Sequence, residues 1–328
     1  MSSIANSVKI HLKFYSEFLR KRFFIYGLTM AMVAYALRAV ASGMFIPYSV
    51  QKITNGLYDR SQSLVTQGLW LLAVSGAIYA LTEWGFRPFW NSIAESIRSV
   101  KIGLIENLAS KGDNKDTIGR IVNDVDFVLW NIGGLINSFV PNVLTAIVAE
   151  ITIFAMSPTL GLIQLSGLPA YMAILEHYVK NVEKARTVER SAYSESIHAA
   201  SEYLEGRAGA DAFTSALNRW RRGIGANIHL DRVYWSSSFA TSYLIPVASA
   251  IVGIGYVNDG KLSVGSLIGV LTAALTMHTA LVNALWGICL LGQNVVPINR
   301  ILSIKQANAQ KTEALAQPRI STPSRTLS

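Results

Sequence analysis

The chain has 328 residues, of which 15% are charged and 51% are hydrophobic, and its mean hydropathy is +0.34. Soluble domains usually contain about 25% charged residues, so this composition excludes an ordinary soluble enzyme. The single cysteine, Cys289, excludes a disulfide framework and a cysteine-rich zinc site, and we expect no metal on the chain. We attribute the net charge of +9 to the cytoplasmic loops of a membrane protein and expect no nucleic-acid partner.

Five long segments contain no Asp, Glu, Lys or Arg. A membrane-spanning helix needs roughly 18 or more apolar residues in succession, and every segment is longer than that. Together with the apolar stretch 23–50, they predict an all-α membrane protein with six transmembrane helices. The segments cover residues 61–82, 127–149, 151–175, 233–258 and 262–299.

The first half of the chain begins with a segment, 1–22, whose charged residues alternate with apolar ones, as in an amphipathic helix on a membrane surface. The first span, 23–50, is interrupted only by Arg38. The second span starts near Ser63, and its apolar periodicity predicts a helix that continues into water as far as Leu108. A polar turn over 110–117 then leads into a third span that ends near residue 156.

The second half repeats this arrangement. The fourth span starts at Leu160 and continues as a charged helix, and residues 177–232 form two helical arms joined by a glycine-containing elbow at 205–209. The fifth and sixth spans cover about 233–256 and 264–297. We expect the transmembrane domain to occupy 23–305, and the polar segment 306–328, which has no aromatic residue, to be a disordered cytoplasmic tail.

Charge predicts the orientation. Only three of the 29 Lys and Arg residues, Lys52, Arg60 and Lys261, fall at the ends of the spans that carry short loops. Because cytoplasmic segments have an excess of Lys and Arg, we expect both termini and both arms in the cytoplasm of a protein of the cell (inner) membrane.

Four short motifs occur in the order and at the topological places seen in the membrane domain of type IV ATP-binding-cassette (ABC) exporters, which the chain resembles over about 20–305. The chain departs from the family at the first elbow, where Leu108 and Ser110 replace an aromatic pair and an acid, and at Asp211, which replaces a basic residue. The motifs are residues 120–125 (RIVNDV), Glu202-x-x-x-Gly206 with Ala212 and Phe213, residues 260–267 (GKLSVGSL), and Arg300 with Ile301.

The resemblance implies a half-transporter that works as a homodimer or with one related chain. It also implies elbows that act as coupling elements to a separately encoded ATPase, which would bind ATP and magnesium. Leu262 stands where a phosphate-binding loop needs Ser or Thr after its lysine, so we expect no ATP hydrolysis and no bound cofactor on this chain. The coupling candidates are Leu108, Ser110, Asp113, Arg207, Asp211 and Phe213.

Polar and aromatic residues within spans are candidates for a cavity or gate, because ionisable groups there are costly. We expect Arg38 and Glu150 to lie toward the outer side, where they can meet as a charged gate or, by preference, as a structural ion pair. Glu83 is expected at the inner boundary. In the sixth span, His278, Asn283 and Trp286 either face a cavity or make hydrogen bonds between helices.

Two other functions stay open at this point. A proton-driven carrier of the same architecture, similar to the SbmA/BacA peptide-uptake family, fits the membrane acids Glu83 and Glu150 and the lack of a nucleotide-binding motif. A non-transporting scaffold of the same fold fits the altered elbows. Four family motifs favour the ATP-driven transporter.

Overall fold

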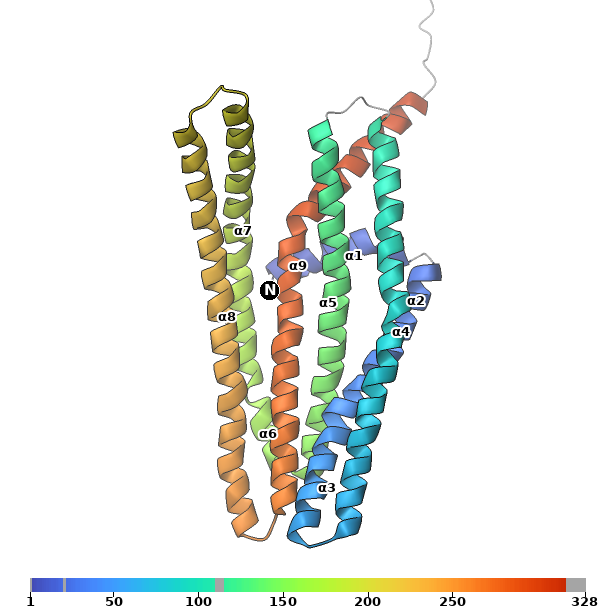
Figure 1. Ribbon diagram of the computed structural model, residues 1–328, viewed down its shortest axis with the longest axis vertical. Coiled ribbons are helices and arrows are strands. Elements are labelled where there is room, and N and C mark those ends of the chain that lie inside the picture. The colour runs from blue at the N-terminus through green and yellow to red at the C-terminus, as the bar shows by residue number, and fades with distance from the viewer. Residues whose placement is uncertain (1, 20–21, 110–114, 317–328) are drawn as a thin grey trace, which may run out of the picture.

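The computed structural model describes residues 2–19, 22–109 and 115–316, in which all regular structure is helical. The long helices run side by side, and α1 crosses their direction (Figure 1). The elements are α1 (Ser2–Leu19), α2 (Arg22–Val40), the π-helix η1 (Ala41–Phe45), α3 (Ile46–Tyr58), α4 (Gln62–Ala109), α5 (Lys115–Met156), α6 (Pro158–Leu165), α7 (Leu168–Leu204), α8 (Ala210–Asn258) and α9 (Val264–Ala316).

Six segments of the described chain are long and apolar enough to cross a membrane, which agrees with the predicted number of spans. The all-α class with six long apolar helices is therefore confirmed. These segments are Arg22–Tyr58, Gln62–Glu106, Asn123–Met156, Pro158–Leu204, Ala210–Asn258 and Val264–Cys289.

The bundle has two ends with different connections. At the short-loop end, α3 turns into α4, α5 into α6 and α8 into α9 (Figure 1). At the opposite arm end, α4 ends, α5 begins, α7 turns into α8, and α9 finishes (Figure 1). This alternation is the one that the sequence predicts.

Helix α9 holds the bundle together. It contributes buried side chains to three hydrophobic clusters: one with α1, α2, α4 and α5, one with α5 and α6, and one with α7 and α8. Helices α7 and α8 pack mainly on each other and form a paired arm, whereas α2, α3, α4 and α5 pack together beside α9. The arm therefore joins the rest of the molecule chiefly along α9.

The first span is longer than predicted and contains a π-helical turn. The N–H of Ile46 donates to the carbonyl of Ala41, five residues earlier, and Pro47 supplies no N–H with which to restore the regular pattern. Gly43 allows a close contact, because a Cβ there would lie 2.8 Å from the backbone nitrogen of Ala149. The turn therefore seats the first span on α5, and the span continues to Tyr58 rather than ending near residue 50.

The predicted disordered tail is wrong over residues 306–316, where α9 continues as a helix. This stretch is rich in Ala, Gln, Lys and Glu, which are strong helix formers, so the lack of aromatic residues did not indicate disorder. Residues 317–328 lie outside the described part of the chain.

Candidate functional site

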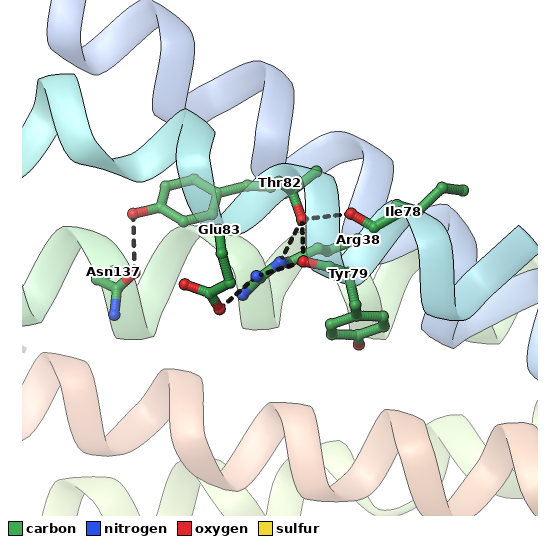
Figure 2. Close-up of polar contacts among 7 residues, drawn as sticks. Arg38, Ile78, Tyr79, Thr82, Glu83 and Asn137 are labelled. Atoms are coloured by element: carbon green, nitrogen blue, oxygen red, sulfur yellow. Dashed lines mark hydrogen bonds and ion pairs between the residues drawn. The ribbon is translucent and has the colours of Figure 1, made fainter.

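Arg38 lies between α2 and α4 and is fully engaged with α4. Its Nη2 donates to Glu83 Oε1 at 2.5 Å and to the Tyr79 carbonyl at 3.1 Å, and its Nε donates to Thr82 Oγ1 at 2.7 Å. Figure 2 shows the guanidinium among these three groups. The guanidinium carbon also lies 4.5 Å from the centre of the Phe86 ring, which adds a cation–π contact. The cluster ties α2 to α4.

The expected contact between Arg38 and Glu150 is wrong. Gly43, which packs on Ala149 of α5, is five residues from Arg38, so Arg38 lies about 7.5 Å further toward the arm end than that contact. At its own level the helix presents Arg38 to α4, where Glu83 supplies the opposite charge. Arg38 does form an ion pair, but with Glu83, which the sequence placed at the inner boundary, and not with Glu150 as predicted.

Glu150 lies beside a mostly apolar cavity, and its carboxylate is buried away from that cavity. Its two carboxylate oxygens are buried, and neither has a hydrogen-bond partner among the described residues. The cavity has a volume of about 500 Å³, and among the described residues that line it Glu150 is the one with an ionisable side chain. The other lining residues are Ala146, Ile147, Ile151, Phe154, Leu165, Leu168, Met277 and Leu281.

His278 joins three helices through its ring. Nε2 lies 2.8 Å from Gln164 Oε1 and Nδ1 lies 3.0 Å from the Tyr171 hydroxyl. Because the carbonyl oxygen of Gln164 only accepts, Nε2 donates and Nδ1 accepts from Tyr171. The buried ring thus makes the interhelical hydrogen bonds that the sequence offered as one of two alternatives, and it links α9 to α6 and α7.

Trp286 belongs to an aromatic cluster between the arm and α9. Its ring centre lies 5.2 Å from that of Trp235, 5.3 Å from that of Tyr234 and 5.7 Å from that of Tyr178. The Tyr178 hydroxyl donates to Asp231 at 2.7 Å. These tilted aromatic pairs bury a large apolar area between the arm and α9, so this cluster anchors the arm.

Asn283 does not join His278 or Trp286 in one site. Its backbone carbonyl accepts a hydrogen bond from the Ser138 hydroxyl at 3.0 Å, which connects α9 to α5. The six cavity or gate candidates are therefore distributed over separate contacts, and Arg38 with Glu83 is the pair among them that the fold brings together.

The second elbow is an ordered turn. Gly206 has φ +70°, a conformation that glycine adopts without strain, and the Arg207 N–H donates to the Glu202 carbonyl at 2.8 Å. The Arg207 side chain forms an ion pair with Glu205. Phe213 stacks on Tyr203, with ring centres 6.0 Å apart and an interplanar angle of 8°. The turn and both helix ends thus form one unit.

Of the four other coupling candidates, the structure describes Leu108 and Asp211. Asp211 is exposed in the first turn of α8, where a carboxylate favours the positive helix end. Leu108 lies in the last turn of α4. Ser110 and Asp113 lie outside the described residues. Between the helices on either side of the first elbow, Lys101 of α4 pairs with Asp126 of α5 at 2.7 Å.

Sequence analysis missed Gln164, Tyr171 and Asp231, which hold the predicted residues in place. Gln164 lies within a charge-free run, and a polar side chain at that position was a usable signal, because intramembrane polar groups find partners. Asp231 had no comparable signal, because it lies in a charged part of α8 and its partner Tyr178 is distant in sequence.

The comparisons with known proteins agree with this architecture. Residues 116–281, slightly more than half of the chain, match the family profile of the ABC transporter transmembrane region. The matched part runs from the start of α5 through the arm into α9. A search of curated proteins finds no match. The chain therefore belongs to the ABC transporter transmembrane region family and is a multi-pass membrane subunit of an ABC-type transporter.

Proposed function

We propose that this chain moves a substrate across the membrane by alternating access, driven by a separately encoded ATPase that docks on the tip of the α7–α8 arm. In this proposal two such chains, identical or related, enclose the transport pathway. ATP and magnesium bind to the ATPase subunits. The observation that carries the proposal is an ordered elbow with exposed apolar side chains at the end of a stiff helical arm in a chain of this family.

The arm is long enough to transmit movement. Helices α7 and α8 have 37 and 49 residues, which correspond to about 55 Å and 73 Å, against about 30 Å for the hydrocarbon core. Their facing sides are tied by hydrogen bonds from Trp220 to Glu189 at 3.3 Å and from Arg219 to Glu195 at 3.2 Å. A paired helix of this kind moves as a lever.

The tip of the arm suits a docking contact. Leu204 is 84% exposed and Tyr203 is 45% exposed, so an apolar patch stands at the elbow beside the stacked Phe213. Apolar residues clustered on an exposed tip are typical of a protein-binding surface. The Gly206 turn and the Arg207–Glu205 pair hold this patch in a fixed shape.

Movement of the elbow reaches the membrane through the aromatic cluster. Tyr178 and Tyr234 of the arm contact Trp286 of α9, and the Tyr234 hydroxyl donates to the Val282 carbonyl at 2.8 Å. Because α9 also packs along α5, a swing of the arm shifts α9 against the remaining spans. This shift would open one side of the pathway and close the other.

A crosslinking experiment tests the docking proposal. A photoreactive amino acid in place of Leu204 should capture an ATP-binding protein in the native membrane. Leu57 is a matched control, because it is an exposed leucine at the short-loop end. Capture of the same ATPase from both positions, or of no ATP-binding protein from Leu204, would contradict the proposal.

The proposal includes an orientation, with both termini and the arm in the cytoplasm, supported by the excess of Lys and Arg there. Single cysteines in a Cys289→Ala background test it. A cysteine at Gly209 should react with an impermeant thiol reagent only from the cytoplasmic side, and cysteines at Leu57 and Asp259 only from outside. The opposite labelling pattern would show that the protein has the opposite orientation in the membrane.

Proton-driven transport is the second candidate, and it is favoured by the buried carboxylate of Glu150, for which the described part of the chain supplies no hydrogen-bond partner. A pH gradient would then drive uptake into proteoliposomes that contain no ATPase. Glu150→Gln should abolish that uptake, because a neutral amide cannot carry the proton. Phe213→Ala should leave it intact, whereas the same change should stop ATP-driven transport.

A further inference from the structure

A groove opens between the first turn of α2 and the middle of α4. It has a volume of about 760 Å³. Helix α4 supplies five polar residues to its lining, and α2 supplies two phenylalanines, so one wall is polar and the other is aromatic. The lining residues are Phe23, Phe24, Asn91, Ala94, Glu95, Ser96, Arg98 and Ser99.

The groove lies at the level of lipid head groups. Asn91 is 29 residues from Gln62, where α4 begins, which corresponds to about 44 Å along the helix. A bilayer with its head groups is about 40–45 Å thick. Helix α1, which the sequence predicts on the membrane surface, crosses the bundle near the start of α2 (Figure 1). The groove therefore opens where the phosphates of one leaflet lie.

Several hydrogen-bond donors in the groove are unused. Glu95 accepts from Arg98 Nε at 2.9 Å and from Nη2 at 2.6 Å, which fixes the guanidinium and leaves its Nη1 without a hydrogen bond to any described residue. The side-chain amide of Asn91 and the hydroxyl of Ser99 also donate to no described residue. Three side chains on one part of α4 can thus bind the oxygens of a ligand.

Two further arginines flank the groove. Arg22 directly precedes Phe23, and Arg87 stands one helical turn before Asn91 on the same face of α4. Both are exposed, and neither forms an ion pair with a described residue. Together with Arg98 they place three guanidinium groups around a groove that contains one carboxylate. The charge therefore favours an anion, and guanidinium groups bind phosphate through strong charge-assisted hydrogen bonds.

We propose that this groove binds the head group of an anionic glycerophospholipid. The phosphate accepts hydrogen bonds from Arg98 Nη1, the Ser99 hydroxyl and the Asn91 amide. The volume of about 760 Å³ lies within the range of about 300–1,000 Å³ for pockets that hold small organic ligands.

An acyl chain of the lipid has a surface to follow. Exposed apolar side chains at intervals of three and four residues form a stripe along α2, from the groove toward the short-loop end. The stripe consists of Phe23, Tyr26, Met30, Val33 and Leu37. Its first residue also lines the groove, so head group and chain can be bound at the same time. This continuity favours a lipid over a free phosphate ester.

The site is independent of the proposed transport cycle. In the proposed orientation the groove faces the cytoplasmic leaflet, whose anionic lipids attract basic segments. Binding of the lipid requires no ATPase and no transported substrate. A failure of this proposal would therefore leave the proposed function untouched, and the reverse is also true.

A lipid titration tests the proposal. The full chain in dodecylmaltoside is titrated with dioleoyl phosphatidylglycerol and, separately, with dioleoyl phosphatidylcholine, which has the same chains and no net charge. Native mass spectrometry gives the dissociation constant of the first bound lipid. We expect phosphatidylglycerol to bind at least fivefold more tightly. Glycerol 3-phosphate, which has the phosphate without the chains, should bind at least tenfold more weakly than phosphatidylglycerol.

Four variants locate the site. Arg98→Gln and Arg22→Gln should each weaken phosphatidylglycerol about fivefold and leave phosphatidylcholine unchanged. Ala94→Phe, which fills part of the groove, should weaken phosphatidylglycerol without a change of charge. Arg222→Gln is the matched control and should bind as the unmodified chain does. Arg222 is an exposed arginine 36 residues from the short-loop end of α8, and Arg98 is equally far along α4.

Three results would overturn the proposal. The first is an unchanged preference for phosphatidylglycerol in folded Arg98→Gln and Arg22→Gln variants. The second is an equal loss in Arg222→Gln, which would indicate attraction by the overall positive charge. The third is equal affinity for glycerol 3-phosphate and phosphatidylglycerol, which would indicate a site for a free phosphate ester.

Discussion

Two acidic side chains of the membrane region have opposite surroundings. Glu83 on α4 accepts a 2.5 Å hydrogen bond from Arg38 of α2, whereas the oxygens of Glu150 on α5 are buried and have no partner among the described residues. Glu83 meets a cation because α2 presents Arg38 at the same level, and no described helix presents one to Glu150. Glu83 ties α4 to α2, whereas Glu150 makes no such contact among the described residues.

The largest expected change in stability comes from removing Arg38, the cation of the Arg38–Glu83 pair. Arg38→Ala should lower the free energy of unfolding by about 2–3 kcal/mol, because it removes charge-assisted hydrogen bonds to Glu83 and Thr82. The loss is smaller than for a fully buried pair, since the Glu83 side chain is 67% exposed. Unfolding in mixed micelles of dodecylmaltoside and dodecyl sulfate, followed by circular dichroism, measures it. An unchanged stability would contradict the structural role of the pair.

Replacing Glu150, which has no hydrogen-bond partner among the described residues, should raise the free energy of unfolding. Glu150→Met replaces a buried acid by an unbranched apolar side chain, and we expect the free energy of unfolding to rise by about 1–2 kcal/mol, because the desolvation cost of an unsatisfied group disappears. The same unfolding measurement applies. A clear loss of stability would mean that Glu150 has a structural partner in the assembled protein.

A smaller loss of stability is expected when Glu83, the acid of the Arg38–Glu83 pair, is replaced by its neutral amide. Glu83→Gln keeps an oxygen that accepts from Arg38 but removes the opposite charge, so the free energy of unfolding should fall by about 1 kcal/mol. The comparison with Arg38→Ala separates charge from shape. A loss as large as that of Arg38→Ala would show that the negative charge accounts for the whole contact.

The smallest effect concerns the two sites together. Arg38→Ala and Glu150→Met should have additive effects, with a coupling energy below about 0.5 kcal/mol in a double-mutant cycle, because the two residues share no partner. The matched cycle of Arg38 with Glu83 should give a coupling above about 1 kcal/mol. A strong coupling between Arg38 and Glu150 would restore the contact that the structure contradicts.

Much of the architecture was predictable from local patterns. The number of spans, the break between residues 156 and 160 and the elbow at 205–209 agree with the structure. Long charge-free runs leave a helix few alternatives, because in lipid the backbone must satisfy its own hydrogen bonds. The π-helical turn was not predicted. Gly43 and Pro47 were visible in the sequence, but the approach of α5 that makes the glycine necessary was not.

The contacts of individual side chains were less predictable than the helices. The sequence placed Glu83 at a boundary and Glu150 inside a span, and it offered hydrogen bonding as one reading of His278. It did not reveal that Arg38 turns toward α4, that His278 meets Gln164 and Tyr171, or that Asp231 receives the Tyr178 hydroxyl. These partners are more than 40 residues apart along the chain, and no periodic pattern joins them.

The sequence by itself determined the class of the protein, the number of its spans and the family motifs around its elbows, because hydropathy and turn residues act over a few neighbouring positions. Only the tertiary structure decided which membrane acid meets a cation and which is buried with no hydrogen-bond partner among the described residues. That outcome depends on the rotation and relative height of neighbouring helices, which the packing of small residues such as Gly43 against α5 sets. A carboxylate has the same local sequence signal whether or not a cation stands opposite it.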